Sequence, residues 1–503
     1  HGLALGESTT AGNFPVSQRG SALLWIRPLT QMAMERCRTA RCAIDTMGAL
    51  AEVHGFYGED AGASGAGEAL VVADGKEVWV FHITGDATGT SAFWVAQRVP
   101  DGHVVAVANN FVIRQVDCEY QDNYRCSTDL LSKAKAIGAS SGEGALDFAR
   151  AMGPDIRNFS YTPGYSPIPM YTTARLWRVF SRVAPSLGLR LTDNPYDVPF
   201  SVKSERRLSH RHLMDLKRDH YEGTEIDLTV GPMAGPFGSP NRLEGGEGLK
   251  VTRGQFARAI SLPRTSYCCI GHSFGEESGA KHFNKWWYAS DSPASSVFVP
   301  FYTGAWEFAA AYRIGHMSKY DDRSAWWVFD FVANWMDINY RLMSIDVRKK
   351  LSEWQDRVDR ECEEHEARAV GSDNPHLLFG EFQAALQSKV VDAWRGFGHH
   401  LIMKYNDGRI NYPEIAQPIG YPAWWLQTFG VDSDIFPKWG RPSDSPPTLY
   451  ELCGPGPFAK CSPQDLDLGE LAAGEDVAAP PRASVPLYEV AVLLVAGQAV
   501  TFL

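Results

Sequence analysis

The sequence lacks an excess of positive charge, a recognisable metal-binding motif and an internal repeat. Its 503 residues include 48 Lys and Arg against 59 Asp and Glu, which gives a net charge of -11. Nucleic-acid binding requires a basic surface, so we expect no nucleic-acid partner. The nine cysteines include no Cys-x-x-Cys pair, and the histidine pairs at 210/212 and 399/400 are too closely spaced to share a helix face. We therefore expect no bound metal.

The start of the chain lacks an initiator methionine, a charged leader and an apolar signal core. We therefore expect translation to begin upstream of His1, in a precursor that is trimmed here or in a longer protein of which this chain is a part. What is present is typical of a globular protein, because 44% of the residues are hydrophobic and 21% are charged. The chain is long enough for one large domain or two smaller ones.

Two pairs of cysteines enclose short polar or Gly/Pro-rich loops. Cys118 and Cys126 enclose EYQDNYR, and Cys453 and Cys461 enclose GPGPFAK. Pairs at this spacing are typical of disulfides formed in an oxidising compartment. Asn158 opens the single N-glycosylation sequon, which is consistent with secretion. We therefore expect a lumenal or extracellular protein of the secretory pathway, with a membrane tether if the C-terminal tail described below is an anchor.

Residues 1–143 alternate the patterns of strands and helices. Strands are predicted for GLALGES and SALLWIRP, and the periodicity of the following stretch predicts two helices that are interrupted near Thr39. Asp-Gly pairs at 74–75 and 101–102 lie between β-branched runs, which predicts two hairpins. Strands, paired helices and hairpins in this order indicate an α/β layer sandwich with a mostly antiparallel sheet.

Helical patterns dominate residues 144–441. Apolar residues recur at the spacing of a helix face in three segments, and the third continues into a long charged stretch. The segments are MYTTARLWRVFSRVAP, SHRHLMDLKRDHYEG and SAWWVFDFVANWMDINYRLM. We assign this region to the same domain as the first 143 residues, as its mostly helical portion.

The composition changes at the end of the chain. Residues 442–486 are small, acidic and proline-containing, which is typical of a linker. Residues 487–503 are apolar except for Glu489, Gln498 and Thr501. This tail is slightly short for a membrane-spanning helix, which needs about 20 apolar residues. It is interpreted as the start of a membrane anchor, a docking strand or a surface helix.

Taken in order, ten stretches resemble one family, the N-terminal-nucleophile cysteine dipeptidases related to bacterial dipeptidase A and the secernins. The stretches are HGLALGEST, AMERCRTARCAIDTMGALAEVHGFYG, WVFHITGDATGTSAFWVAQRVPDG, VANNFVIR, RDHYEGTEIDLT, GPFGSPNR, RTSY, SVFVPFY, SAWWVFDFVANW and GYPAWWLQTFGV. Each stretch alone is a motif of low specificity, but their occurrence in this order along the chain as far as Val431 is specific for the family.

The resemblance implies a fold and a reaction. The fold would be an Ntn-hydrolase-like αββα four-layer sandwich with a large helical C-terminal portion. The reaction would be hydrolysis of a dipeptide or short peptide by an N-terminal cysteine, whose own α-amine acts as the general base. Such a reaction uses no cofactor. The substrate's carboxylate would suit the planar fork of an arginine.

In the family the nucleophilic cysteine lies upstream of the strand that HGLALGEST resembles. We therefore expect the nucleophile on a segment that precedes His1, so that this chain lacks it. The family strand often continues with Cys after Glu-Ser-Thr, whereas this chain has Thr10 there. That later Cys is not the nucleophile, so its replacement does not imply inactivity.

Five positions are candidates for the site. Asn109, in the family's Ala-Asn-x-Phe position, is expected to donate a hydrogen bond near the substrate or the oxyanion, or else to terminate a strand. Arg264 is the candidate for binding the carboxylate, with Thr265 as a supporting donor, and the alternative is a structural salt bridge. Glu7 and Ser8 end the first strand, where they line the pocket or satisfy backbone groups.

The run DHYEGT places Asp219, His220 and Glu222 at a helix end followed by glycine. We interpret these residues as capping the helix and fixing the loop, with a pocket wall as the alternative.

Two other functions remain open at this stage. The protein could be a catalytically inactive relative that acts as a structural subunit of a membrane or protein assembly, with contacts through the C-terminal tail and the aromatic helices. An N-terminal His-Gly also begins copper-dependent polysaccharide monooxygenases. Those enzymes are β-sandwiches, whereas this chain is substantially helical, so we set that class aside.

Overall fold

The computed structural model describes residues 2–10, 12, 21–58, 67–86, 88–140, 145–153, 170–242, 257–274, 283–369, 372, 374–411, 416–428 and 490–491. Within these residues the fold is mixed α/β and all of its sheets are antiparallel, as predicted. Asn158, the pair Cys453 and Cys461, the linker 442–486 and most of the tail 487–503 lie outside the described residues.

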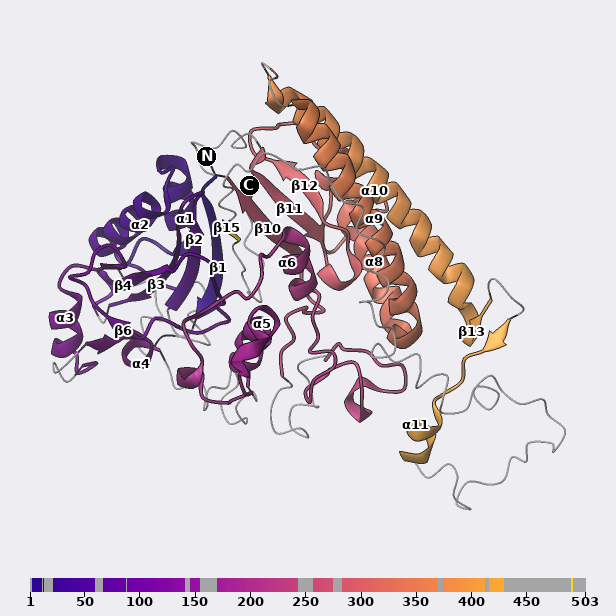
Figure 1. The fold of residues 1–503 in the computed structure, drawn as a ribbon, viewed down its shortest axis with the longest axis horizontal. Coiled ribbons are helices and arrows are strands. Elements are labelled where there is room, and N and C mark those ends of the chain that lie inside the picture. Colours follow the sequence, from indigo (N-terminus) through magenta and orange to yellow (C-terminus); the bar gives the residue numbers. More distant parts are fainter. Residues whose placement is uncertain are drawn as a thin grey trace.

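Five strands form the first sheet, in the order β1-β2-β3-β4-β7 (Figure 1). They are β1 (Ala4–Thr10), β2 (Gly67–Ala73), β3 (Val78–Gly85), β4 (Ala92–Val99) and β7 (Tyr124–Cys126). The predicted hairpin between β2 and β3 is confirmed. Its turn is fixed by Asp74, whose Oδ1 accepts the backbone N–H groups of Lys76 and Glu77 at 2.7 and 2.9 Å.

Two helices, α1 (Ile26–Arg36) and α2 (Ala40–His54), cover one face of this sheet (Figure 1). Their break is where it was predicted, because Thr39 caps α2 by accepting the backbone N–H of Cys42. The predicted strand over residues 21–28 is wrong. Helix α1 begins at Ile26, since Pro28 is tolerated in the first turn of a helix, and Leu24 forms only an isolated bridge with Phe56.

The second predicted hairpin is also wrong. The turn at Asp101 and Gly102 forms, but β4 pairs with β3 and β7, whereas β5 (His103–Val105) pairs with β9 (Ser201–Lys203). The chain after β5 crosses the other face of the first sheet, where Val105 and Val107 join its second core. This path brings the next residues to the end of β1.

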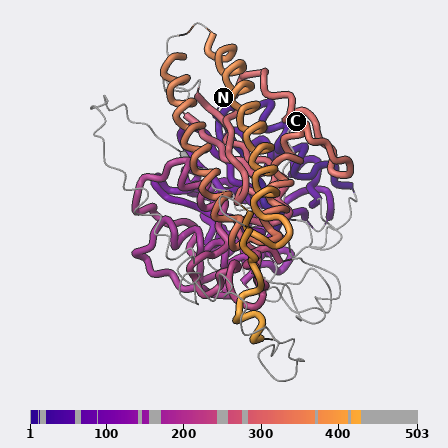
Figure 2. Tube along the Cα trace, turned by 90° about the vertical axis from the view of Figure 1, so that its right-hand side faces the viewer, coloured from indigo at the N-terminus to yellow at the C-terminus, as the bar shows by residue number. Residues whose placement is uncertain are grey.

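A second sheet has the order β12-β11-β10-β15. Its strands are β10 (Tyr267–Ser273), β11 (Lys285–Ser290), β12 (Val299–Tyr302) and β15 (Val490–Ala491). The two described tail residues therefore form a short strand beside His272 and Ser273. The helices α8 (Ala325–Ile338), α9 (Tyr340–Ala369) and α10 (Pro375–Tyr405) pack on this sheet around the largest apolar core (Figures 1 and 2).

Buried glutamines join these helices to the β12 region. The side-chain oxygens of Gln355, Gln383 and Gln387 accept the backbone N–H groups of Phe298, Tyr302 and Ala309 at 2.8 to 2.9 Å. Backbone N–H groups around β12 that would otherwise be unsatisfied in the core thus have glutamine side chains as hydrogen-bond partners.

Shorter elements complete the described fold. They are β6 (Gln115–Val116), α3 (Leu130–Ala136), β8 (Leu146–Asp147), α4 (Phe148–Met152), α5 (Thr173–Val183), α6 (His210–Lys217), β13 (Arg409–Ile410), β14 (Gln417–Pro418) and α11 (Ala423–Thr428). Among the described helices, none is both long enough and apolar enough to cross a membrane. Disulfides join Cys118 to Cys126 and, at a position that the sequence analysis did not consider, Cys37 to Cys42.

Candidate functional site

Asn109 is held against the end of β1 by two hydrogen bonds. Its backbone N–H donates to Ser8 Oγ at 2.9 Å, and its Nδ2 donates to the Thr9 carbonyl at 2.8 Å. The residue is only 9% exposed, and its φ of 57° lies in the left-handed region, which asparagine tolerates better than most residues. Asn109 therefore has a fixed backbone and does not simply end a strand.

The other end of the Asn109 amide is fixed as well. Its Oδ1 accepts from Arg175 Nη2 at 2.9 Å and from the Tyr171 hydroxyl at 3.2 Å. An arginine can only donate, so the oxygen must face Arg175 and the NH₂ group must face β1. One hydrogen of that NH₂ group goes to Thr9, and the second has no hydrogen-bond partner among the described residues.

Two arginines surround the Tyr171 ring. Arg258 Nη1 donates to the Tyr171 hydroxyl at 2.6 Å, and its guanidinium carbon lies 4.5 Å from the centre of the ring. The guanidinium carbon of Arg175 lies 4.8 Å from the same centre. Tyr171, Arg175 and Arg258 are 3%, 1% and 7% exposed. The Asn109 network, as we call these residues with Ser8, thus brings two positive charges into a buried place.

The DHYEGT run holds Arg258 in position. The Tyr221 hydroxyl donates to the Arg258 carbonyl at 2.5 Å, and the Asp219 carbonyl accepts the backbone N–H of Ser261 at 3.1 Å. Tyr221 has a φ of 66°, which Asp219 Oδ1 supports by accepting its N–H at 2.7 Å. Asp219 also forms a buried ion pair with Arg178. The run therefore fixes a loop, as one part of the interpretation had it, whereas the C-cap of α6 is Arg218.

Beside the network, His82 fixes the segment that follows Asn109. Its Nε2 accepts the backbone N–H groups of Val112 and Ile113 at 2.9 and 3.3 Å. The imidazole is fully buried, and burial lowers its pKa to about 3. A neutral ring is required here, because only a neutral imidazole has a nitrogen that can accept.

Of the five predicted site residues, the structure shows two in direct contact, Ser8 and Asn109. Glu7 lies on the opposite face of β1 from Ser8, where it accepts from the Thr9 hydroxyl at 2.9 Å. Arg264 is exposed in the turn before β10, and Thr265 donates its hydroxyl to the Leu262 carbonyl at 2.8 Å within that turn. The roles proposed for Glu7, Arg264 and Thr265 remain predictions.

Three residues of the network were not predicted from the sequence: Arg175, Arg258 and Tyr171. A signal for Arg175 was present, because it lies on the buried side of α5 among Leu176, Val179 and other apolar residues. A charged side chain on an apolar helix face is almost always held by a polar network. No comparable signal marks Arg258, whose neighbours in sequence do not form a helix in the described residues.

The described residues contain no reactive thiol and no metal cluster. The free cysteines are Cys268, Cys269 and Cys362, and burial raises the pKa of each thiol. A nucleophile must be a thiolate, so none of the three is suited to attack a substrate. No group of three His, Cys, Asp or Glu in the described part of the chain could hold a metal ion.

The sequence pattern of Peptidase family C69 matches residues 22–353, and the protein belongs to that family. A probable dipeptidase of Latilactobacillus sakei is 25% identical over 65% of this chain and 60% of its own length. A probable dipeptidase of Salmonella dublin is 26% identical over 48% of each chain. A dipeptidase of Bifidobacterium longum is 23% identical over 62% of this chain and 54% of its own length. The chain thus aligns with at most about three fifths of these relatives.

Proposed function

We propose that this protein is a dipeptidase-type peptide hydrolase whose nucleophile is a cysteine at the mature N-terminus of a segment preceding His1. Membership of Peptidase family C69 and the dipeptidase names of three relatives support the reaction class. The observation that carries the proposal is the orientation of the Asn109 amide, which Arg175 and Tyr171 fix with its NH₂ group toward the end of β1.

In the proposed reaction the thiol proton passes to the α-amine of the same cysteine, and the thiolate sulfur attacks the carbonyl carbon of the peptide bond. The electron pair of the carbonyl moves to its oxygen, which the second Nδ2 hydrogen of Asn109 stabilises. The C–N bond then breaks, the leaving amine takes the proton, and an acyl-thioester remains. Water hydrolyses this thioester and restores the thiol. The reaction as written uses no metal and no organic cofactor.

The charge of the network supports a short substrate with a free carboxylate. The positive charge of two guanidinium groups favours a nearby carboxylate or oxyanion in a buried place. We therefore propose unblocked dipeptides as substrates, with the C-terminal carboxylate on the arginine side of the site.

We also propose the four-layer αββα arrangement and an oxidising compartment. The first is supported by the helices that cover one face of each sheet (Figure 1) and by the approach of the two sheets. A Cβ atom added to Gly271 of β10 would lie 3.4 Å from the Ala4 Cβ of β1. The two disulfides, Cys37–Cys42 and Cys118–Cys126, support the second.

The test uses the natural protein with all of its N-terminal sequence. Its N-terminal residue and intact mass are determined, and an unblocked dipeptide is compared with its N-acetylated and C-amidated forms. We expect an N-terminal cysteine, hydrolysis of the unblocked dipeptide, and loss of activity when that cysteine is replaced by alanine. A full-length protein that has no such cysteine, or that hydrolyses none of the three, contradicts the proposal and favours a non-catalytic subunit.

The Asn109 amide is tested in the same protein by Asn109→Ala. Removing one oxyanion donor lowers kcat by about 100- to 1000-fold, and we expect a loss of that size. The matched control is Asn110→Ala, because among the described residues this neighbouring side chain donates a hydrogen bond to the Phe111 carbonyl, at 3.4 Å, and none to β1 or Arg175. Equal activity of the two variants would remove Asn109 from the mechanism.

A further inference from the structure

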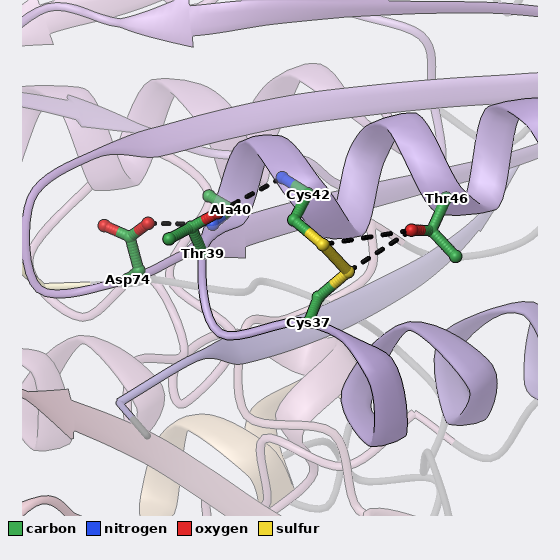
Figure 3. Close-up of a disulfide and its surroundings, with 6 residues drawn as sticks. All are labelled: Cys37, Thr39, Ala40, Cys42, Thr46 and Asp74. Atoms are coloured by element: carbon green, nitrogen blue, oxygen red, sulfur yellow. Dashed lines mark hydrogen bonds between the residues drawn. A yellow bond between two sulfur atoms is a disulfide. The ribbon is translucent and has the colours of Figure 1, made fainter.

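The disulfide between Cys37 and Cys42 joins the end of α1 to the first turn of α2 (Figure 3). Its two sulfur atoms differ in environment. Cys37 is 3% exposed and belongs to the apolar core beneath the two helices, whereas Cys42 is exposed to solvent. A thiol in solution therefore reaches the Cys42 sulfur and not the Cys37 sulfur.

Thr46 lies next to both sulfur atoms, one turn further along α2 (Figure 3). Its Oγ1 is 3.2 Å from Cys37 Sγ and 4.0 Å from Cys42 Sγ. The sulfurs of a disulfide carry no hydrogen, so the hydroxyl is the donor. A hydroxyl at this distance stabilises negative charge on Cys37, which is the charge that appears when the disulfide opens by attack on Cys42.

The start of α2 does not depend on the disulfide. Thr39 caps the helix, and the backbone N–H of Ala40 donates to Asp74 Oδ2 at 2.8 Å. The Arg41 guanidinium donates to the Glu77 carboxylate, from its Nε at 2.9 Å and 3.2 Å and from its Nη2 at 3.0 Å. These contacts tie the first turn of α2 to the β2–β3 hairpin, so the disulfide can open while the helix keeps its place.

The second disulfide, between Cys118 and Cys126, does not join one exposed cysteine to one buried cysteine. Cys118 and Cys126 are both half-buried and pack against the core on the other face of the first sheet. Cys126 is also paired with Val95 within the sheet. Access to either sulfur is restricted, and the pair serves as an internal reference for structural disulfides.

We propose that Cys37 and Cys42 form a reversible site for exchange with low-molecular-weight thiols, independent of the proposed peptidase activity. The thiolate of one small thiol attacks Cys42 Sγ, the S–S bond breaks, and Cys37 leaves as a thiolate that takes up a proton. A second small thiol attacks the sulfur of the first, releases a small-molecule disulfide, and leaves Cys42 as a thiol. Two thiols are oxidised and one protein disulfide is reduced.

The experiment exposes the native protein to reduced glutathione, stops the reaction with iodoacetamide at set times, and maps the alkylated cysteines by mass spectrometry. We expect Cys37 and Cys42 to become alkylated while Cys118 and Cys126 stay joined, with no change in far-ultraviolet circular dichroism. Opening of both disulfides at the same rate, or only in denaturant, would overturn the proposal.

Two sets of variants test whether the exposure of Cys42 and the hydroxyl of Thr46 direct the exchange. Oxidised glutathione should modify Cys42 in the Cys37→Ser variant at least about tenfold faster than Cys37 in the Cys42→Ser variant, because only Cys42 is exposed. In the otherwise native protein, Thr46→Val should slow opening about tenfold, and Thr46→Ser should restore it. Equal rates within either set would show that exposure and the hydroxyl do not direct the exchange.

Discussion

The Tyr171 hydroxyl accepts a hydrogen bond from Arg258 Nη1 at 2.6 Å and donates one to Asn109 Oδ1 at 3.2 Å. Through this one oxygen the position of Arg258 is coupled to that of the Asn109 amide. Arg258 is in turn held by Tyr221 through its backbone carbonyl. In the proposed reaction Tyr171 is therefore a positioning residue, which acts through Asn109.

Tyr171→Phe removes this oxygen and retains the ring. A buried donor that loses its acceptor costs about 1 to 3 kcal/mol, so we expect a loss of that size in the free energy of unfolding by urea. We also expect kcat to fall at least about tenfold with little change in KM, because the transition-state donor is less well placed. Both are measured on the natural full-length protein.

The matched control for Tyr171→Phe is Trp177→Phe. Trp177 is on α5, near Tyr171 in sequence, and its Nε1 donates to the Leu189 carbonyl at 2.8 Å, away from Asn109. This variant should lose a similar amount of stability and keep its kcat. A Tyr171→Phe variant that is destabilised but equally active would assign Tyr171 a purely structural role.

A second prediction concerns the ion pair between Arg178 and Asp219. Asp219 is 6% exposed, its Oδ2 lies 2.7 Å from Arg178 Nη2, and burial raises the pKa of its carboxyl group. Asp219→Asn keeps the shape but leaves the arginine charge buried, which costs about 3 to 5 kcal/mol. We expect a loss of that size in urea denaturation, whereas Glu353→Gln, in an exposed pair with Lys350, should change stability by less than about 1 kcal/mol. Similar values for both variants would contradict this assignment.

The elements that the sequence predicted correctly are those with a local cause. The β2–β3 hairpin follows from the Asp74-Gly75 turn, and the break between α1 and α2 follows from the capping residue Thr39. The failed hairpin is different, since its turn formed but its second strand paired with Ser201–Lys203. Pairing across such a separation depends on which apolar face is available in the folded chain, and no local pattern encodes it.

The residues of the candidate site were likewise predicted from the sequence only in part. Asn109 and Ser8 were predicted because the residues around each resemble family motifs, and the structure places them in contact. The arginines of the Asn109 network were missed, because Arg175 contacts Asn109 directly and Arg258 acts on it through Tyr171, from segments that are far apart in sequence and approach only through tertiary packing. Arg264 lies in the recognisable motif RTSY, which is why the sequence favoured it.

A third prediction concerns Asp291, which is 4% exposed and has a φ of 57°. Burial, with a smaller contribution from the nearby Asp330, raises its pKa to about 7. The folded state therefore holds a proton that the unfolded state loses near pH 4, so the stabilising contribution is lost as pH rises through about 7. Asp291→Asn stays neutral at every pH and suits the left-handed backbone.

We expect the gain in Tm of Asp291→Asn over the parent protein to be larger at pH 8 than at pH 5, because the parent loses this contribution between about pH 4 and about pH 7. Thermal unfolding followed by circular dichroism at both values measures this. The matched control is Asp407→Asn, because Asp407 has a φ of 55° but is exposed. A gain that is equal at the two pH values would trace the effect to the backbone conformation and not to titration.

The last prediction concerns the contribution of His82 to the free energy of unfolding as the pH falls. Burial lowers the pKa of His82 to about 3, whereas the unfolded chain takes up a proton near pH 6.5. Between these values the unfolded state binds more protons, so stability is fully present above about pH 6.5 and is lost as pH falls toward 3, at up to about 1.4 kcal/mol per pH unit. His272, whose pKa burial also lowers to about 3, adds a separate contribution.

His82→Gln keeps an oxygen that can accept from Val112 and Ile113 but removes the titration. We expect the variant to be less stable than the parent at pH 7.5, because the packing against Phe111 and Phe148 changes, and the difference to shrink as pH falls from 6.5 to 5. The difference in stability is measured by urea denaturation at pH 7.5, 6.5 and 5, which bracket the ordinary histidine pKa of about 6.5. His54→Gln, at an exposed position, should follow the parent at every pH. A difference for His82→Gln that stays constant with pH would show that the buried imidazole is not the source of the acid sensitivity, because only a group that titrates in the unfolded chain can make the difference shrink.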